Sequence, residues 1–291
     1  MIAEHDDEFV AHRALLFSIA YEILGSVADA EDAVSECWIR WHDVDHENVD
    51  NPRAYLARIV TRQALNAARS AGRRREEYVG PWLPEPLEAR GADAGLDHVL
   101  TGEAVTTAML LVLESLTPTE RAVFVLREVF DFDYSEIAAA VDKTEPAVRQ
   151  VAHRARNHVR ARRSAAVAEP TQAQSVAERF MASAMTGDVQ GLMDVLSPGV
   201  VFIGDGGGVV SAARRPIEGV DHVARIVTGL LAKVAQLGEL EMRATVVNAM
   251  PAIIVSIDSV VDTVTCIQVS GEHVTAVYSI RNPEKLTRFR V

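Results

Sequence analysis

Arginine, the side chain best suited to pairing with phosphates and with the edges of bases, is concentrated in two short stretches of the chain. Residues 51–75 hold 7 arginines and no acid, and residues 145–170 hold 6 arginines and 2 acids. The remainder is acidic or close to neutral, so the net charge of the 291 residues is −12. This pattern predicts two separate contacts with a polyanion and an acidic surface for a basic protein partner. The alternative is two solvated, arginine-rich helix faces.

The second stretch has the pattern of a DNA-reading helix. Its apolar residues recur at the spacing of a buried helical stripe: Val148, Val151, Ala152, Ala155 and Val159. The other face carries Arg149, Gln150, His153, Arg154, Arg156 and Arg160. We expect the first four of these polar residues to read base edges and the last two to contact phosphate. With the short helix 134–141 and a turn at 142–144, the stretch predicts a helix-turn-helix, although a purely structural helical hairpin has the same pattern.

The first stretch begins at Pro52, which is well tolerated in the first turn of a helix. A helix from Pro52 to about residue 69 has one apolar face and one polar, basic face, the latter formed by Arg58, Arg62, Asn66 and Arg69. The polar loop 43–51 before it has the composition to hold an unstacked base, and an ordinary surface loop is equally consistent with the residues.

The elements around these stretches are mostly helical up to residue 163. Apolar spacing predicts helices at 11–24 and 29–41, the second with acids in its first turn. Residues 76–101 are rich in proline and glycine and predict a linker. Thr117, Pro118 and Glu120 form a capping box that starts another helix. A second linker is expected at 164–172.

Beyond residue 172 the character of the sequence changes. A helix is expected at 176–185, followed by β-branched runs that predict strands at 200–203, 245–247, 253–256, 260–269 and 274–280. The sequence therefore predicts a multidomain chain, with two all-α domains followed by an α+β domain that contains a curved sheet.

The order of acidic helix, polar loop, basic helix, linker and helix-turn-helix resembles the extracytoplasmic-function sigma factors of bacterial RNA polymerase. The strings LGS at 24–26 and DAEDAVSECW at 29–38 resemble sigma region 2.2, and NPRAYL at 51–56 resembles regions 2.3 and 2.4. Residues 116–163 resemble region 4. The resemblance implies core polymerase as partner, through its β′ clamp and β flap, and promoter DNA at the −10 and −35 elements. It assigns core binding to Asp29, Glu31, Asp32 and Glu36.

Three further strings resemble a SigJ-like subgroup that carries a SnoaL-like C-terminal domain. They are WLPEP at 82–86, DGGG at 205–208 and NPEKL at 282–286, where the subgroup usually has Asp in place of Glu284 and often a basic residue in place of Val209. The resemblance implies a cone-shaped fold and a domain that modulates the sigma factor. We expect the three strings to contact one another through Trp82, Leu83, Pro84, Glu85, Asp205, Gly206, Gly207, Gly208, Asn282, Pro283 and Lys285. Lys285 and Glu85 are candidates for an ion pair, and the alternative to contact among the strings is that Trp82 packs on its own sigma domain.

The resemblance implies domains at 1–75, 102–163 and 173–291, joined by linkers at 76–101 and 164–172. SnoaL-like domains share their fold with ketosteroid isomerase, for which Asp205, Asp258 or Asp262 would be a candidate base and Tyr278 a candidate donor. We expect no enzymatic activity, because a structural turn explains Asp205 better. The alternative function is a stand-alone helix-turn-helix regulator fused to a ligand-binding or isomerase-like domain.

The remaining expectations concern cofactors and location. His222 and His273 stand alone, and Cys37 and Cys266 lie far apart, so we expect no metal, no cofactor and two free thiols. An unknown small ligand in the third domain is a further possible partner. No run of 18 apolar residues and no basic-then-apolar leader occurs in the sequence, which favours a cytoplasmic protein without a membrane partner.

Overall fold

The computed structural model describes residues 2–88, 106–162, 168–234 and 236–289. These form two compact units. The helical unit consists of residues 1–76 and 90–163, and the sheet unit consists of residues 77–89 and 164–291. The segment 77–88, which we call the strap, therefore belongs by its contacts to the sheet unit, although it precedes half of the helical unit in sequence.

Three helices make up the first half of the helical unit: α1 (Ile2–Leu24), α2 (Val27–His42) and α3 (Pro52–Glu76). Gly25, with φ +67°, ends α1, and the Ser26 hydroxyl accepts a hydrogen bond from the Asp29 amide to cap α2. The three helices pack against one another around side chains such as Leu16, Val34 and Leu56, each at most 2% exposed.

The second half contains three short helices, one longer helix, a π-helical turn and no strand among its described residues. Its elements are α5 (Thr107–Glu114), α6 (Pro118–Phe124), η2 (Val125–Val129), α7 (Tyr134–Val141) and α8 (Glu145–Arg162). The capping box of Thr117 and Glu120 is present at the start of α6. Asp142 takes a left-handed conformation, φ +55°, and turns the chain from α7 into α8, so the expected helix-turn-helix is formed.

The sheet unit has a six-stranded sheet in the order β2-β1-β6-β5-β4-β3. Only the β1–β6 pairing is parallel among the described strands. Its elements are α9 (Pro170–Thr186), α10 (Val189–Val195), β1 (Leu196–Asp205), β2 (Ile217–Glu218), α11 (Val220–Val234), β3 (Leu240–Val247), β4 (Met250–Ile257), β5 (Val260–Ser270), β6 (His273–Ile280) and η3 (Pro283–Lys285).

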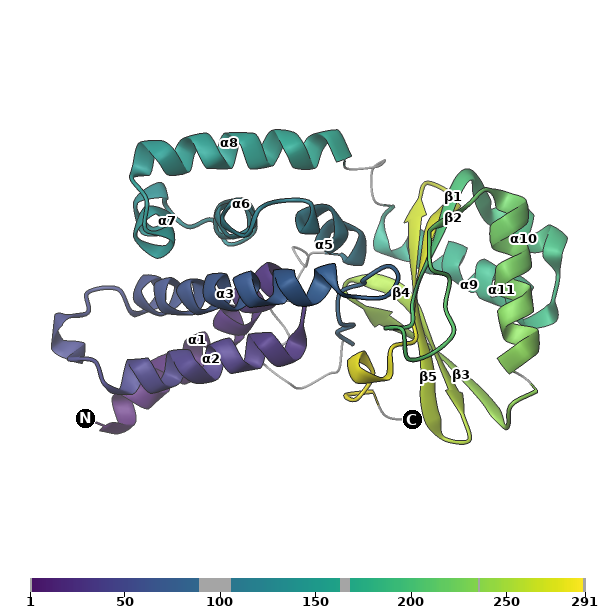
Figure 1. The fold of residues 1–291 in the computed structure, drawn as a ribbon, viewed down its shortest axis with the longest axis horizontal. Coiled ribbons are helices and arrows are strands. Elements are labelled where there is room, and N and C mark those ends of the chain that lie inside the picture. Colours follow the sequence, from purple (N-terminus) through teal and green to yellow (C-terminus); the bar gives the residue numbers. More distant parts are fainter. Residues whose placement is uncertain (1, 89–105, 163–167, 235, 290–291) are drawn as a thin grey trace. The chain divides into compact units, whose positions relative to one another are not determined.

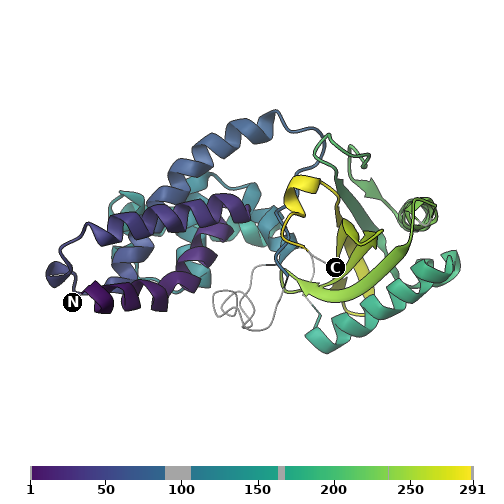
Figure 2. The same ribbon diagram turned by 90° about the horizontal axis from the view of Figure 1, so that it is seen from below.

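The helices of the sheet unit pack on one face of this sheet. Figure 2 shows the sheet curving, and Figure 1 shows α10 and α11 on one side of it and the C-terminal η3 turn on the other. Phe180 of α9, Val223 of α11 and Val277 of β6 meet in the core between helices and sheet.

The expected fold class is confirmed: helical regions are followed by an α+β domain. The sequence did not predict α10 and α11, and it placed the start of α9 six residues too late. Helix α11 is rich in β-branched residues and contains Gly229, both of which weaken helix propensity. Packing of its apolar side on the sheet overrides that weak local preference.

Candidate nucleic-acid interface and linker cluster

Helix α8 presents its predicted base-reading residues to solvent. The stripe from Val148 to Val159 is buried, which turns the opposite face outward. Arg149, Gln150, His153 and Arg154 are exposed and together line a shallow, open hollow. Arg149 is held by Glu145 one turn earlier and lies 4.4 Å over the Tyr134 ring. The four side chains thus present hydrogen-bond donors to solvent from a helix whose apolar face is packed in the core.

The two residues expected to contact phosphate differ in their surroundings. Arg160 is exposed near the end of α8, whereas Arg156 is half-buried and paired with Glu128 at 2.7 Å. Hydrogen bonds to Glu128 and Tyr134 raise the pKa of Arg156, so this guanidinium is firmly cationic. Arg156 thus has a carboxylate partner that a phosphate would have to displace or share.

On α3 the residues predicted to contact the −10 element lie on one side of the helix, but they differ in what their side chains contact. Asn66 and Arg69 are exposed. The Arg58 guanidinium lies 4.6 Å over the Tyr55 ring. Arg62 donates hydrogen bonds to the carbonyls of Ala139, at 2.8 Å, and Ala140, at 3.4 Å, on α7. One member of this set is therefore occupied by the second half of the helical unit.

Helix α2 places the predicted core-binding acids beside exposed apolar side chains. Asp32 is exposed, and Asp29, Glu31 and Glu36 are half-buried. Glu31 pairs with Arg13 at 2.8 Å, and Glu36 pairs with Arg40 at 3.0 Å. The neighbouring Trp38 is 44% exposed and Ile39 is 51% exposed, which is unusual for large apolar residues. An acidic surface with an apolar centre has the composition of a protein-binding surface.

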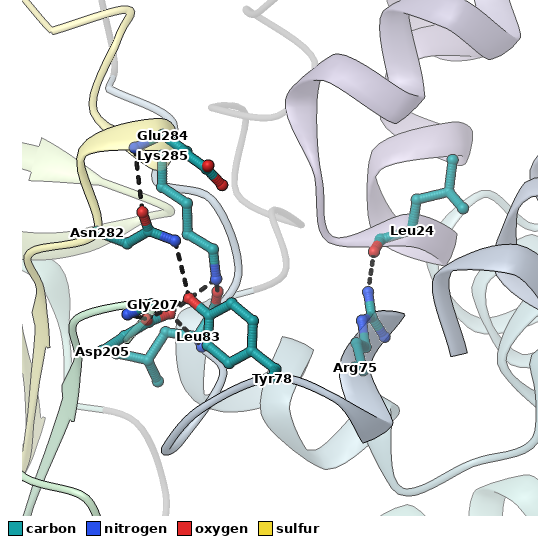
Figure 3. A network of polar contacts seen from close by, with 9 residues as sticks. All are labelled: Leu24, Arg75, Tyr78, Leu83, Asp205, Gly207, Asn282, Glu284 and Lys285. Carbon is teal, nitrogen blue, oxygen red and sulfur yellow. Dashed lines mark hydrogen bonds and ion pairs between the residues drawn. The ribbon is translucent and has the colours of Figure 1, made fainter. Parts of the chain in front are cut away.

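The strap and the two other predicted strings meet at one buried carboxylate, Asp205, which is fully buried at the end of β1. Its Oδ1 accepts hydrogen bonds from the Tyr78 hydroxyl at 2.5 Å and from the Gly207 amide at 3.1 Å. Its Oδ2 accepts from the Leu83 amide at 2.8 Å and pairs with the Lys285 ammonium at 2.7 Å. We call Tyr78, Leu83, Asp205, Asn282 and Lys285 the linker cluster (Figure 3).

Lys285 connects the C-terminal turn to the strap. Besides Asp205, its ammonium donates to the Leu83 carbonyl and lies 4.2 Å from the centre of the Trp82 ring. Lys285 forms an ion pair with the buried Asp205 carboxylate, which the sequence did not predict, and its pairing with Glu85 stays a prediction. A completely buried carboxylate such as Asp205 is stable only when it is paired with a cation or hydrogen-bonded. Trp82 is half-buried, whereas the Leu83 side chain is completely buried.

The glycines after Asp205 allow the three strings to approach closely. Gly207 and Gly208 have positive φ angles of +63° and +73°. A Cβ atom on Gly207 would lie 2.5 Å from Asn282 Nδ2, and one on Gly208 would lie 2.9 Å from the Val79 side chain. A Cβ on Gly206 would lie 2.4 Å from a backbone oxygen. Glycine is therefore required both by conformation and by space.

Asn282 fixes the C-terminal turn and the strap at once. Its Oδ1 accepts from the Glu284 amide at the start of η3, where Pro283 takes the first helical position, and its Nδ2 donates to the Tyr78 oxygen at 2.9 Å. Burial and the hydrogen bond to Asp205 raise the pKa of Tyr78, which keeps its proton for Asp205. The sequence analysis did not identify Tyr78 as a member of this cluster. An aromatic residue four positions before Trp82 in an otherwise polar linker was the signal that could have indicated it.

The other end of the strap is fastened to the β3–β4 hairpin. Leu87 and Asn248 exchange two hydrogen bonds, at 3.1 and 2.9 Å. The Glu88 carboxylate pairs with Arg243 and accepts from Thr245 at 3.0 Å. Pro84 and Pro86 between the two ends are buried. The strap thus runs from the end of β1 to the edge of the sheet and is part of the packing of the sheet unit.

The candidate catalytic groups are engaged in structural contacts. Asp258 lies in an exposed turn and accepts from the Glu239 amide at 2.9 Å. Burial raises the pKa of Asp262, but hydrogen bonds from Arg281 and Thr263 outweigh it, and the pKa lies below its usual value. Burial raises the pKa of Tyr278, whose hydroxyl donates to Gln268 at 2.7 Å. A base of an isomerase needs a raised pKa, and the pKa of Asp262 is shifted in the opposite direction.

The core of the sheet unit contains an apolar pocket of about 70 Å³. Its walls come from α9, α11 and the sheet, and Thr263, Ser279 and Arg281 add polar groups. Among the residues that the structure describes, no group of three His, Cys, Asp or Glu side chains is placed to hold a metal ion. No helix of the described ranges is both long and apolar enough to cross a membrane.

Comparison with protein families gives two matches. The family model for sigma-70 region 2 matches residues 9–74, and that for sigma-70 region 4 matches residues 106–159. The chain is 37% identical over 290 residues to the ECF RNA polymerase sigma factor SigJ of Mycobacterium tuberculosis, with 96% of this chain and 92% of SigJ covered. It is 29% identical over 283 residues to the probable sigma factor SigI of the same species, with 96% and 94% covered.

A solved structure extends the likeness to the whole fold. The crystal structure of Mycobacterium tuberculosis extracytoplasmic function sigma factor SigJ matches with a TM-score of 0.79 and 33% sequence identity. The match covers 97% of this chain and 98% of that one. Both units, and not only the helical one, therefore have counterparts in that protein.

Proposed function

The chain belongs to the extracytoplasmic-function RNA polymerase sigma factors, alternative sigma factors that direct transcription, and we propose on that premise how its parts divide this work. Residues 1–75 act as region 2 and 102–163 as region 4, with 173–291 as a SnoaL-like modulating domain and linkers at 76–101 and 164–172. The matched ranges 9–74 and 106–159 support the first two boundaries. The protein acts in the cytoplasm, where it joins core polymerase on promoter DNA.

Core polymerase binds at α2, which contacts the β′ clamp, while region 4 contacts the β flap. The observation that carries this proposal is the acidic surface of Asp29, Glu31, Asp32 and Glu36 around the exposed Trp38. Substituting Trp38 with Ala is expected to weaken core binding without unfolding α2, because its side chain is nearly half exposed. Pull-down of the full chain with core polymerase and run-off transcription measure the effect. Tight operator binding without any core binding would instead favour the stand-alone regulator.

The two basic helices read the two promoter elements. Arg149, Gln150, His153 and Arg154 select bases at the −35 element, and Arg156 and Arg160 contact phosphate. Arg58, Arg62, Asn66 and Arg69 act at the −10 element. The exposure of the first four residues in one hollow supports the −35 assignment. Selection of promoter sequences by the reconstituted holoenzyme, followed by single alanine variants, tests each assignment.

The sheet unit modulates the sigma factor through the linker cluster. Tyr78 lies two residues beyond the end of α3, so a change at Asp205 acts on the chain segment that leaves region 2. Tyr78→Phe removes the hydroxyl between Asp205 and Asn282 while keeping the ring, and we expect altered transcription at unchanged base preference. Lys285→Met is expected to be more severe, since it leaves a buried carboxylate without its cation, at a cost of about 3–5 kcal/mol.

A matched control distinguishes this cluster from a general effect of charge. Lys233 is exposed near the end of α11, so Lys233→Met removes the same charge from the same unit and should change neither stability nor transcription. If Tyr78→Phe and Lys285→Met transcribe like the unmodified protein, the cluster has a structural role only.

The modulating domain is proposed to act without turnover of a substrate. The engagement of Asp205, Asp258 and Asp262 in hydrogen bonds supports this view. Incubation of the full chain with a panel of small ketones should show no turnover. Turnover that Asp262→Asn abolishes would support the isomerase-like alternative. The pocket beside Arg281 is the place where a small apolar ligand would act on the same domain.

A further inference from the structure

A polar hollow of about 330 Å³ lies in the sheet unit and shares no lining residue with the apolar pocket of the core. One wall is the start of the strap, residues 79–81, and the other is formed within residues 204–214, from the end of β1 along the loop toward β2. None of the described residues that line this hollow is acidic. A polar space of this size can hold a small molecule, and a lining without carboxylates favours an anion.

The loop after β1 leaves several backbone amides without a protein acceptor. The amides of Val209 and Val210 donate to the Gly206 carbonyl at 3.0 and 3.1 Å, which closes a turn. The next four amides, those of residues 211–214, donate to no acceptor in the part of the chain that the structure describes. Backbone amides are strong donors that need a partner, so these four are satisfied by water or by a bound anion.

Glycines keep this run of amides accessible from the hollow. A Cβ atom on Gly204 would lie 3.3 Å from the amide nitrogen of Ala213, and one on Gly80 would lie 3.9 Å from the Cα atom of Arg214. Both glycines line the hollow, one in each wall. Side chains at these positions would fill the space in front of the loop, whereas glycine allows a ligand to approach the backbone closely.

Two arginines add positive charge to the same loop. Arg214 lines the hollow and Arg215 follows it, and both are exposed. Neither forms an ion pair with a residue of the described ranges. Arg281, by contrast, pairs with Asp262 at 2.9 Å and donates to the Ser211 carbonyl at 2.8 Å, which fixes the first residue of the amide run. The loop is therefore anchored, while the guanidinium groups of its two arginines are available to a ligand.

We propose that this hollow binds a small organic phosphate. The phosphate oxygens accept hydrogen bonds from the amides of residues 211–214 and from the guanidinium groups of Arg214 and Arg215. Two guanidinium groups match the charge of about −1.5 to −2 that a phosphomonoester carries at pH 7. The carbon part of the ligand packs on Val79 and Val209, which line the hollow and are 53% and 66% exposed.

Such a ligand contacts both walls of the hollow and therefore holds the start of the strap against the loop after β1. Val79 directly follows Tyr78, which donates to Asp205 in the linker cluster at 2.5 Å. Because a ligand stabilises the state that it binds more tightly, the bound phosphate favours the molecule in which the linker cluster is formed. Only this consequence rests on the proposed modulating function, since the binding of the phosphate does not depend on it.

Calorimetric titration of the full chain tests the proposal without polymerase or DNA. The probes are ribose 5-phosphate and adenosine 5′-monophosphate, with ribose as the probe that lacks a phosphate. We expect both phosphates to bind in competition with one another and ribose not to bind. In Arg214→Gln/Arg215→Gln both phosphates should bind at least about tenfold more weakly, because hydrogen bonds between charged groups are lost. Both side chains are exposed, so the variant should fold normally.

The matched control is Arg179→Gln/Arg225→Gln, which removes two exposed arginines from α9 and α11 of the same unit and should bind both phosphates like the unmodified chain. The proposal is overturned if neither phosphate binds, or if the two double variants bind them equally well. A fluorescent duplex provides the last arm. If Arg214→Gln/Arg215→Gln weakens binding of the duplex but not of the small phosphates, the two arginines contact nucleic acid and the small-ligand proposal is wrong. Altered transcription with no phosphate bound would leave the modulating function standing without this ligand.

Discussion

Helices α8 and α3 are both basic, but Arg149 of α8 and Arg62 of α3 have different partners. On α8, the residues assigned to bases face solvent and share an open hollow, with Arg149 held by Glu145 and Tyr134 of its own region. On α3, Arg62 is bound to the carbonyls of another region. Composition alone makes the two helices equivalent. Arginine density therefore does not distinguish the two helices, whereas the partners of Arg62 and Arg149 do.

The largest loss of stability is expected when the buried arginine at the junction of regions 2 and 4 is removed. Arg121→Met takes away the hydrogen bond to the Glu22 carbonyl and leaves Glu114 with Arg75 alone. We expect the helical unit to lose about 3–5 kcal/mol of stability against denaturant. In chains that stay folded, duplex binding by α8 should stay constant, because Arg149, Gln150 and His153 are exposed.

Arg179→Met is the matched control for this prediction, because Arg179 is exposed on α9 of the sheet unit. It should leave both stability and DNA binding unchanged. Equal stability of Arg121→Met and the unmodified chain would show that the buried arginine does not hold regions 2 and 4 together.

The second prediction concerns the pH dependence of the same junction. Burial raises the pKa of the Glu22 carboxyl to about 8, partly offset by Arg121. Its Oε2 and Arg121 Nη2 find no hydrogen-bond partner among the described residues. The charged groups nearest the junction are Arg121, Glu114 and Arg75.

The folded state therefore keeps a proton on Glu22 that the unfolded state releases above its ordinary pKa of 4.5. Stability from this group is fully present below pH 4.5 and is lost as the pH rises to about 8, by up to about 1.4 kcal/mol per pH unit. Glu22→Gln should remove this slope, so that the variant gains stability over the unmodified chain as the pH rises. Denaturation curves measured across this pH range give the slope, and parallel slopes for the two proteins would contradict the assignment.

The fold class and the segments that carry the candidate site could be predicted because they depend on residues that are close together in the sequence. The capping box at Thr117, the stripe from Val148 to Val159 and the β-branched runs of the sheet each follow from residues a few positions apart. The linker cluster was located from three strings, but its pairings were not. Lys285 binds Asp205 because that carboxylate is completely buried, and burial depends on residues more than 70 positions away in the sequence. The occupation of Arg62 by backbone carbonyls has no sequence signal, since every residue has a carbonyl.

A third prediction tests the exposed helix. Arg149→Ala removes a guanidinium that Glu145 and Tyr134 hold in place near the start of α8. The variant should lose about 1–3 kcal/mol of discrimination at one base position of the −35 element, since an arginine pair with guanine is worth that much. Holoenzyme binding to a set of single-base variants of a selected promoter measures the loss. Uniform weakening at all bases would mean that Arg149 contacts phosphate.

The smallest expected effect distinguishes a phosphate contact from a base contact on the same helix. Arg160 is exposed more than two turns beyond Gln150 and, within the part of the chain that the structure describes, has no ion pair that DNA would have to break. Arg160→Ala should weaken binding to all sequences alike and reduce the slope of log affinity against log salt by about one unit or less, because one phosphate contact is lost.

Arg156→Ala should change the slope less than Arg160→Ala, since Arg156 already has a carboxylate partner in Glu128 that competes with phosphate. Titrations of a fluorescent duplex at several salt concentrations give both slopes, and a larger change for Arg156→Ala than for Arg160→Ala would show that the Glu128 pair opens on DNA.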